Sequence, residues 1–401
     1  MKCLFYLFIL FSILIFTFCN LNKIYDDCLN ECGLSQSFFP DSEESEGHYR
    51  SFGGYASKIN KTPFVGLIRG KIRDCNYRVF CTAIIIGPYH VLTAEHCLEV
   101  RVPVDHECYS EPLIVHSDAQ NMSQHTNTLR RSEISLFVGI TNINEIKETE
   151  AIRINKIIIK SRLIKNENIF DSNYTDIALL ETKRKLHFNA SIRPICLNKN
   201  FEETFGQMVY FTGFGQTNDK FNRPPISGDK VIDEGSLQTI NIALSSPEFC
   251  KASDGSINNK NMYICAGTKL SGIDGGDSGG ALYFYNKGRA FLLGIAASIS
   301  SKSNNVNMTL TKKSLNRDLY PDTFTRTSSL CNWIETLSNI KCKNIEIEIK
   351  KECKERAFNF IKNDEYEEKI IFENRKDEGI IVSKSEKKKE DKKSWWDSLW
   401  G

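Results

Sequence analysis

The feature that most constrains the fold of this chain is a series of short apolar runs separated by polar turns. Several of the runs alternate apolar with polar side chains, and the clearest ones cover 64–72, 82–86, 134–138, 154–159, 209–212 and 291–299. Runs of this length, with Gly and Asn between them, are typical of strands rather than helices. Many short strands predict an all-β sandwich or barrel.

The composition supports a folded core and narrows the class of partner. The chain has 401 residues, of which 41% are hydrophobic, and a formal net charge of +2. An apolar content of this size is normal for a globular protein. A net charge near zero predicts no nucleic-acid partner and no steering of ligands by the overall charge.

The first residues have the pattern of a secretory signal peptide, which we place at 1–19. Lys2 gives a positive start, and Leu4 to Phe18 form a nearly continuous apolar run. This run is shorter than the ~20 residues of a membrane-spanning helix. A retained signal anchor is the alternative. The pattern predicts a secreted, extracellular protein.

Cysteine and asparagine usage agree with secretion. The chain has 14 cysteines, of which Cys3 and Cys19 lie in the signal peptide. The even number that remains predicts disulfides in an oxidising compartment. Asn-x-Ser/Thr sequons predict a glycoprotein. They lie at Asn60, Asn121, Asn173, Asn189 and Asn307.

A glycine-rich hexapeptide, 275–280, carries the strongest chemical signal. It places Ser278 between paired glycines, directly after Asp277. Glycines let the backbone approach a substrate carbonyl without a Cβ in the way. The N–H groups of Gly276 and Ser278 can then point to one place and form an oxyanion hole. Ser278 is therefore a candidate nucleophile.

Two further motifs complete a catalytic constellation. Leu92-Thr93-Ala94-Glu95-His96-Cys97 lies upstream, and Asp176 begins the run Asp-Ile-Ala-Leu-Leu between this motif and the serine. His, Asp, Ser is one of the known chain orders of a catalytic triad. Taken singly, His96 could be a structural histidine, Asp176 could cap the edge of a strand, and the motif around Ser278 could be an ordinary turn. Their joint occurrence in this order favours catalysis.

On these motifs, residues 51–340 resemble the chymotrypsin/trypsin-like serine proteases. The resemblance implies that His96 is the general base, that Asp176 orients its imidazole and that Ser278 attacks the scissile carbonyl. It also implies two six-stranded antiparallel β-barrels with the triad between them, closed by a C-terminal helix at 331–337. No cofactor or metal is expected.

The same resemblance implies activation by cleavage. Residues 20–50 are expected to be a propeptide that is cut after Arg50, just before Ser51-Phe52-Gly53-Gly54. The freed amine of Ser51 would then pair with Asp277 and order the oxyanion loop, since buried charges are tolerated when paired. Members of the family usually carry a bulky aliphatic residue where this chain has Ser51. The alternative is that Arg50 is an ordinary linker residue.

Several disulfides follow from the resemblance, and others are guesses from proximity along the chain. The resemblance implies Cys81–Cys97, Cys250–Cys265 and a bond from Cys196 to Cys32 or Cys28. Such a bond would keep the cut propeptide attached. Proximity along the chain suggests Cys75–Cys108 and Cys342–Cys353, and Cys28–Cys331 is a weaker guess. Spacing alone does not prove connectivity.

The expected specificity pocket departs from the trypsin-like pattern. Gly272 stands where those relatives carry an acid, six residues before the nucleophile. Asp322 lies on a second floor segment and would favour Lys or Arg before the cut; the alternative is that it caps a turn. Ile273 and Ile299 are expected to line the pocket and narrow it. The pattern leaves the substrate preference open.

A second departure concerns the segment that pairs with the substrate backbone. Ala297 and Ser298 replace the Ser and Trp that are usual in the family, and Ala297 removes a hydroxyl that supports the catalytic Asp. Losing one such hydrogen bond costs about 1 kcal/mol, which slows chemistry without abolishing it.

The leading hypothesis is therefore a secreted serine endopeptidase that is made as a zymogen. Its partners would be protein or peptide substrates, an activating protease and protein inhibitors. The alternative is a catalytically weak or inactive protease-like binding or regulatory protein. Residues 341–401 form a charged, Trp-ended tail that is expected to be disordered. Nothing in the sequence supports membrane contact by this tail.

Overall fold

The structure is a computed structural model of the whole chain. It describes residues 28, 30–35, 55–71, 78–98, 129–160, 175–215, 235–250, 261–268, 271–299, 321–350 and 353. Two compact units divide the chain: one is Met1–Glu31 with Ile349–Gly401, and the other is Cys32–Glu348. Within the first unit, Cys28 is bonded to Cys353 and the Lys350 ammonium lies 3.5 Å from the Glu31 carboxylate. No helix of the described residues is long and apolar enough to cross a membrane.

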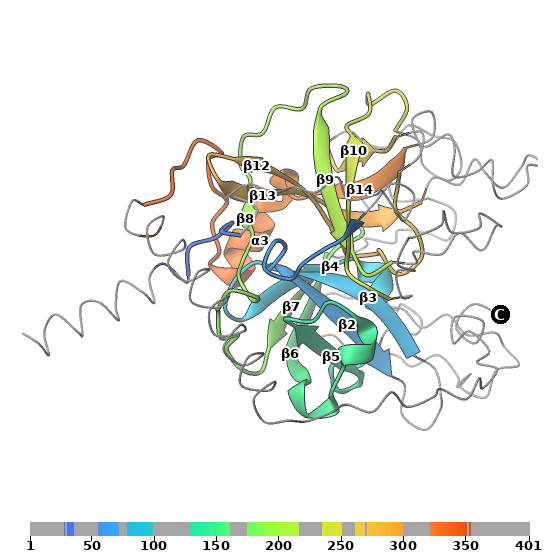
Figure 1. Cartoon of the computed structure of the whole chain (residues 1–401), viewed down its shortest axis with the longest axis vertical. Coiled ribbons are helices and arrows are strands. Elements are labelled where there is room, and N and C mark those ends of the chain that lie inside the picture. The colour runs from blue at the N-terminus through green and yellow to red at the C-terminus, as the bar shows by residue number, and fades with distance from the viewer. Residues whose placement is uncertain are drawn as a thin grey trace, which may run out of the picture. The chain divides into compact units, whose positions relative to one another are not determined.

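The first half of the larger unit is a closed six-stranded barrel in the order β2-β3-β4-β7-β6-β5, with antiparallel neighbours (Figure 1). Its strands are β2 (Val65–Lys71), β3 (Arg78–Ile85), β4 (His90–Thr93), β5 (Ile134–Val138), β6 (Ile152–Ile159) and β7 (Ala178–Thr182). Aliphatic residues are buried along its strands, among them Leu67, Ile84, Leu92, Leu136 and Leu179. Removing this apolar surface from water drives the barrel to close.

The second half is an eight-stranded sheet with the path β1-β10-β9-β12-β13-β14-β11, and β8 pairs in parallel with β13. Its strands are β1 (Tyr55–Ala56), β8 (Cys196–Leu197), β9 (Met208–Gly213), β10 (Gln238–Ala243), β11 (Tyr263–Ala266), β12 (Ala281–Asn286), β13 (Arg289–Ser298) and β14 (Asp322–Arg326). Its core is rich in aromatic rings; Phe211 and Phe324 lie 5.8 Å apart, and Phe284 stacks on Phe291 at 5.6 Å.

Short helical turns connect the strands, and the α-helix α3 follows β14 and η8. The turns are η2 (Glu95–Leu98), η3 (Arg131–Glu133), η4 (Ile143–Glu145), η5 (Glu148–Glu150) and η8 (Ser328–Leu330). The helix is α3 (Cys331–Ser338), which buries Cys331 and Ile334 and ends at a left-handed Asn339 with φ of 59°. A left-handed residue at this place is a common way to stop a helix.

The predicted all-β, chymotrypsin-like architecture with a C-terminal helix is confirmed, with one difference. Only the first sheet closes into a barrel, and the second is a half-barrel. A single bridge, between Leu244 after β10 and Ala266 in β11, connects the two sides of this sheet. The chain enters a turn directly after Leu244, in which Phe249 donates to the Ser246 carbonyl. Because the chain turns here, β10 does not continue far enough to form a full ladder of hydrogen bonds with β11.

Five disulfides join described residues: Cys28–Cys353, Cys32–Cys196, Cys81–Cys97, Cys250–Cys265 and Cys331–Cys342. The bonds implied by the resemblance are among them, with Cys32 rather than Cys28 as the partner of Cys196. The guesses Cys342–Cys353 and Cys28–Cys331 are wrong. Cys75 and Cys108 lie outside the described residues.

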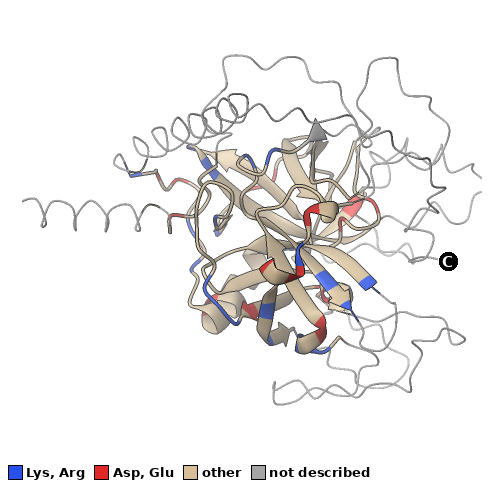
Figure 2. Ribbon diagram, turned by 60° about the horizontal axis from the view of Figure 1, so that its bottom comes forward, with Lys and Arg blue, Asp and Glu red and all other residues tan. Residues whose placement is uncertain are grey.

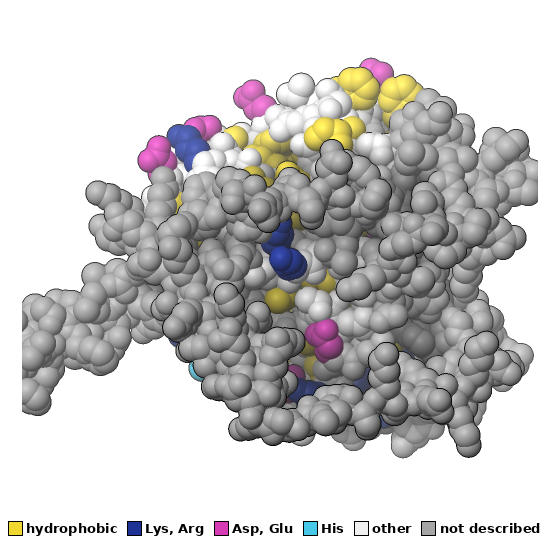
Figure 3. Space-filling view, viewed as in Figure 1, with side chains coloured by type: hydrophobic (Ala, Val, Ile, Leu, Met, Phe, Trp, Pro, Cys, Tyr) yellow, Lys and Arg dark blue, Asp and Glu magenta, His cyan; other side chains and the backbone are white. Residues whose placement is uncertain are grey.

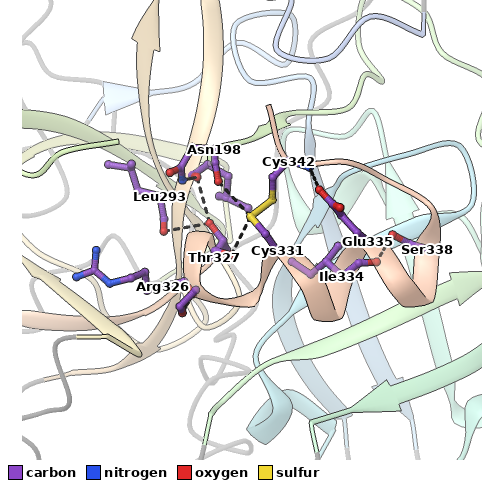
Figure 4. Close-up of a disulfide and its surroundings, with 11 residues drawn as sticks. Asn198, Leu293, Arg326, Thr327, Cys331, Ile334, Glu335, Ser338 and Cys342 are labelled. Atoms are coloured by element: carbon purple, nitrogen blue, oxygen red, sulfur yellow. Dashed lines mark hydrogen bonds between the residues drawn. A yellow bond between two sulfur atoms is a disulfide. The ribbon is translucent and has the colours of Figure 1, made fainter. Parts of the chain in front are cut away.

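The reversal after α3 explains the corrected pairing of Cys342. The left-handed Asn339 turns the chain back, and the Cys342 N–H donates to the Glu335 carboxylate at 2.8 Å (Figure 4). The Cα atoms of Cys331 and Cys342 are therefore 5.8 Å apart, within bonding reach. Residues 341–348, the beginning of the expected tail, belong to the larger unit. Residues 354–401 lie outside the described part of the chain.

Candidate active site

His96 is held on η2, directly after β4. The Cys81–Cys97 disulfide fixes this turn to the neighbouring β3. The imidazole side chain is 26% exposed, so that one edge remains accessible. Its Nδ1 lies 2.6 Å from Asp176 Oδ2, and its Nε2 lies 2.7 Å from Ser278 Oγ. The ring therefore bridges a carboxylate and a hydroxyl, one at each nitrogen.

Asp176 precedes β7 and is almost fully buried. Burial raises the pKa of this carboxyl, but the charge and hydrogen bond of His96 and the N–H groups of His96 and Glu95 outweigh it. The net effect lowers the pKa, so the carboxylate stays ionised. Its Oδ1 accepts the His96 N–H at 3.0 Å. Two contacts with one residue fix the ring orientation.

Ser278 lies in the loop between β11 and β12. The Thr82 N–H donates to the Ser278 carbonyl at 2.9 Å, which joins the loop to the first barrel. Gly279 has φ of +81°, and a Cβ there would collide with the Thr82 carbonyl oxygen. Only glycine fits this close approach. The glycines after the serine are therefore required by the packing of the loop.

The two N–H groups that are predicted to hold the oxyanion belong to Gly276 and to Ser278 itself. Gly276 has φ of +91°, a backbone conformation that favours glycine. Within the described part of the chain, the N–H groups of Gly276 and Ser278 donate to no other group. They are available to a substrate oxygen, while the intervening Asp277 N–H is used by the Asp274 carbonyl at 3.0 Å.

The Asp277 side chain points away from this hole, toward the backbone of the second sheet. It is 7% exposed and accepts the N–H groups of Gly215 at 2.8 Å and Asp274 at 3.0 Å. Among the described residues, no cation pairs with it. Burial is the main cause that raises its pKa to about 7; the charges of Asp274 and Asp322 add to the effect, and the two N–H groups oppose it. Ser51, its expected partner, lies outside the described residues.

The structure brings three of the four expected pocket residues together. Gly272 and Ile273 are buried beside Asp322, whose Oδ2 accepts the Ile273 N–H at 2.8 Å. Asp322 is fully buried. Ile299 follows β13 and is 38% exposed, so it lies at the surface.

Buried threonines, which the motifs do not include, support the site. Thr82 Oγ1 donates to the Gly276 carbonyl at 3.3 Å and accepts the Phe214 N–H at 3.0 Å. Thr325 Oγ1 donates to the Asp176 carbonyl at 2.8 Å. A polar residue inside an apolar strand run is the sequence signal for Thr82, whereas Thr325 lies in a mostly polar strand. Ala297 lies at a bulge in β13 and carries no hydroxyl, and the backbone N–H groups of His96 and Glu95 donate to the Asp176 carboxylate.

The predicted glycosylation sites are only partly described. Asn189 is exposed, and its Oδ1 accepts the Ser191 N–H at 2.8 Å. Asn60 is half-buried. Asn121, Asn173 and Asn307 lie outside the described residues.

Comparisons with known proteins agree with this geometry. A family model described as Trypsin matches residues 51–334. Coagulation factor IX of Oryctolagus cuniculus is 28% identical over 259 residues, which are 63% of this chain and 77% of that protein. Trypsin-1 of Astacus astacus is 27% identical over 221 residues, which are 54% of this chain and 76% of that protein. The chain belongs to the trypsin family of serine proteases.

Proposed function

We propose that this chain is a serine endopeptidase that hydrolyses peptide bonds of proteins through an acyl-enzyme. The observation that carries the proposal is the bridging position of His96, 2.6 Å from Asp176 and 2.7 Å from Ser278. These distances are within the range required for a nucleophile and its base.

The geometry suggests each step of the reaction. Ser278 Oγ attacks the scissile carbonyl while His96 Nε2 accepts its proton, and Asp176 stabilises the imidazolium that forms. The N–H groups of Gly276 and Ser278 receive the oxyanion. Collapse of the tetrahedral intermediate breaks the C–N bond, and His96 returns the proton to the leaving amine. Water then repeats the sequence on the acyl-serine and releases the acid.

Activation of a zymogen after Arg50 is part of the proposal. Asp277 supports it, because a buried carboxylate held by only two neutral N–H donors is poorly stabilised. The new amine of Ser51 would supply the missing cation and hold the loop that carries Ser278. Secretion after removal of residues 1–19 is also proposed, and the disulfides are consistent with an extracellular protein.

Digestion of casein by the secreted chain tests the activity. The chain cut after Arg50 should degrade casein, and Ser278→Ala, cut in the same way, should not. If both forms leave casein intact while retaining the fold, the alternative of a catalytically weak or inactive protease-like binding protein would replace this proposal.

A further inference from the structure

The outer surface of the first barrel carries a pocket that the proposed chemistry does not use. It has a volume of about 710 Å³ and is formed by β2, η3, β5, η5, β6 and Lys183, which follows β7. Its basic lining residues are Arg69, Lys71, Arg131, Arg153 and Lys183, and its acidic ones are Glu133 and Glu148. A volume of this size is typical of ligand pockets, which span about 300–1,000 Å³. Figure 2 shows the basic residues of the described strands in blue, and in Figure 3 dark blue side chains are visible at the lower part of the molecule.

Arg69 forms a rigid floor of this pocket. Its side chain is 7% exposed, and the guanidinium carbon lies 5.1 Å from the centre of the Phe137 ring. Its two terminal nitrogens donate to the two oxygens of Glu148 at 2.6 and 2.7 Å. Such a two-point contact is the geometry in which arginine recognises a carboxylate.

Glu148 shows that the pocket stabilises a carboxylate. The hydrogen bond from Arg69 is the main cause that lowers its pKa; burial, the next largest cause, raises it, and the charges of Arg69, Lys71 and Arg153 lower it. The Glu148 side chain is 66% exposed, so it sits at the rim. The Glu148 carboxylate thus pairs with Arg69 at the floor of the pocket and leaves the other basic residues to bind a ligand.

The basic lining residues other than Arg69 are available to a ligand. Lys71, Arg131, Arg153 and Lys183 are exposed and form no ion pair with another described residue. Arg131 donates to the Asn155 carbonyl at 3.0 Å and Arg153 to Ser135 Oγ at 3.1 Å. These bonds orient the guanidinium groups without neutralising them.

The carboxylates in the pocket offset only part of this charge. Glu133 accepts the Arg130 N–H at 2.8 Å, so it serves as a turn cap. Five cations stand against two carboxylates, a surplus of three positive charges in one cavity. A concave site of one sign focuses its field on an oppositely charged ligand.

We propose that this pocket binds an acidic peptide segment through its side-chain carboxylates. The Arg69–Glu148 pair supplies the pattern for such a contact. A sulfated polysaccharide is disfavoured, because two of the lining residues, Glu133 and Glu148, are acidic. The residue types instead suit a peptide whose acidic residues are spaced by neutral ones.

The pocket is separate from the triad. Lys183 follows the last residue of β7 and Asp176 precedes the first, so the five-residue strand lies between them. This strand spans roughly 15 Å. For the proposed protease, the site would select protein substrates with an acidic segment distant from the scissile bond, an extension that rests on the proposed function.

Direct binding tests the pocket without catalysis. The probe is a dye-labelled octapeptide of alternating Glu and Gly, and its control has Gln in place of Glu. Fluorescence anisotropy with full-length Ser278→Ala should show binding of the Glu peptide only. Binding should weaken with salt, because exposed charges are screened over about 10 Å at 0.1 M.

Matched variants locate the site. Arg153→Glu with Lys183→Glu should weaken binding at least about tenfold, since two attractive contacts become repulsive. Lys156→Glu with Lys185→Glu changes the net charge equally, at exposed positions that do not line the pocket, and should change the affinity less than about threefold. Glu148→Gln should tighten binding, because it removes the competing carboxylate from Arg69.

Three results would overturn the proposal. The first is an equal loss in the two double variants, with folding checked by circular dichroism. The second is an unchanged affinity in Arg153→Glu with Lys183→Glu. The third is displacement of the peptide by inorganic phosphate or by a sulfated oligosaccharide at an equal or lower concentration of anionic groups. None of these results depends on whether the chain hydrolyses peptides.

Discussion

At the scale of single residues, the triad could be predicted because its signals are local. His96 and Ser278 each lie within a short stretch of recognisable sequence, and Asp176 follows from chain order. Thr82 could not be predicted in the same way. Its contacts join it to Phe214, Gly276 and Ser278, far along the chain, and only the folded structure shows them.

A substitution of Thr82 tests how much its hydrogen bonds to Phe214 and Gly276 contribute to stability and activity. Thr82→Val keeps the shape but removes the acceptor of the Phe214 N–H and the donor to Gly276. Leaving buried polar groups unpaired costs about 1–3 kcal/mol in the free energy of unfolding. Urea denaturation and turnover of a peptide ester should both show a loss. The exposed Thr336→Val should lose less than about 0.5 kcal/mol, as is usual for surface changes. Equal behaviour of the two variants would contradict this role.

The role of Ile299 in the specificity pocket stays a prediction. β13 ends at Ser298 after a bulge between Ala296 and Ser298, and Ile299 is exposed. Because a bulge adds a residue to one strand, it changes the direction of every side chain after it. Asp322, on a regular part of β14, lies beside Ile273, and its role in the pocket also stays a prediction.

At the scale of elements, the serine loop is positioned by close backbone contacts. Gly215 approaches Asp277 so closely that a Cβ would overlap its carboxylate, whereas a Cβ at Gly275 meets nothing within 4 Å. The two glycines flank the same site but have different surroundings.

Gly215→Ala should therefore displace the Asp277 side chain and the loop that carries Ser278. We expect kcat/KM on a peptide ester to fall at least about tenfold, because small misplacements at a reacting centre are costly. Gly275→Ala should retain activity within about threefold, since its Cβ points to open space. A larger loss for Gly275→Ala than for Gly215→Ala would show that the contact with Asp277 is not what positions the loop.

The disulfide connectivity also belongs to this scale. The guessed partners of Cys28 and Cys342 are wrong, because a left-handed turn after α3 and the return of the C-terminal segment bring other cysteines together. Which cysteines can bond depends on how close the strands and the helix bring them in the folded chain.

At the scale of the whole molecule, two disulfides hold the residues before the proposed cut. Cys32 is bonded to Cys196, and Cys28 is bonded to Cys353. Cleavage after Arg50 should therefore add the mass of one water to the non-reduced protein and release no fragment. Mass spectrometry should show two chains only after reduction. In Cys28→Ser with Cys32→Ser, the fragment should separate without reductant. Its release from the wild type without reductant would contradict this connectivity.

Asp277 makes the stability of the uncut chain depend on pH. Its folded-state pKa is raised to about 7, whereas an unfolded aspartate titrates near 3.9. The folded state thus binds the proton more tightly, so this contribution to stability is complete below about pH 4 and lost as the pH rises through about 7.

Asp277→Asn should remove this dependence from the uncut chain. In urea denaturation it should be similar to the wild type at pH 4 and more stable at pH 8, by at most about 4 kcal/mol. After the cut, the wild type should regain stability at pH 8, because the Ser51 amine then pairs with the carboxylate. A wild type and variant that keep the same difference from pH 4 to pH 8 would show that Asp277 is not an unpaired buried acid.

The most direct test of the central claim is covalent labelling of Ser278 by a fluorophosphonate probe, read by intact mass. The samples are the secreted wild type uncut, the wild type cut after Arg50, and Ser278→Ala cut in the same way. The account predicts one probe adduct on the cut wild type and none on the other two. A cut, folded wild type that remains unlabelled, or a labelled Ser278→Ala, would contradict it.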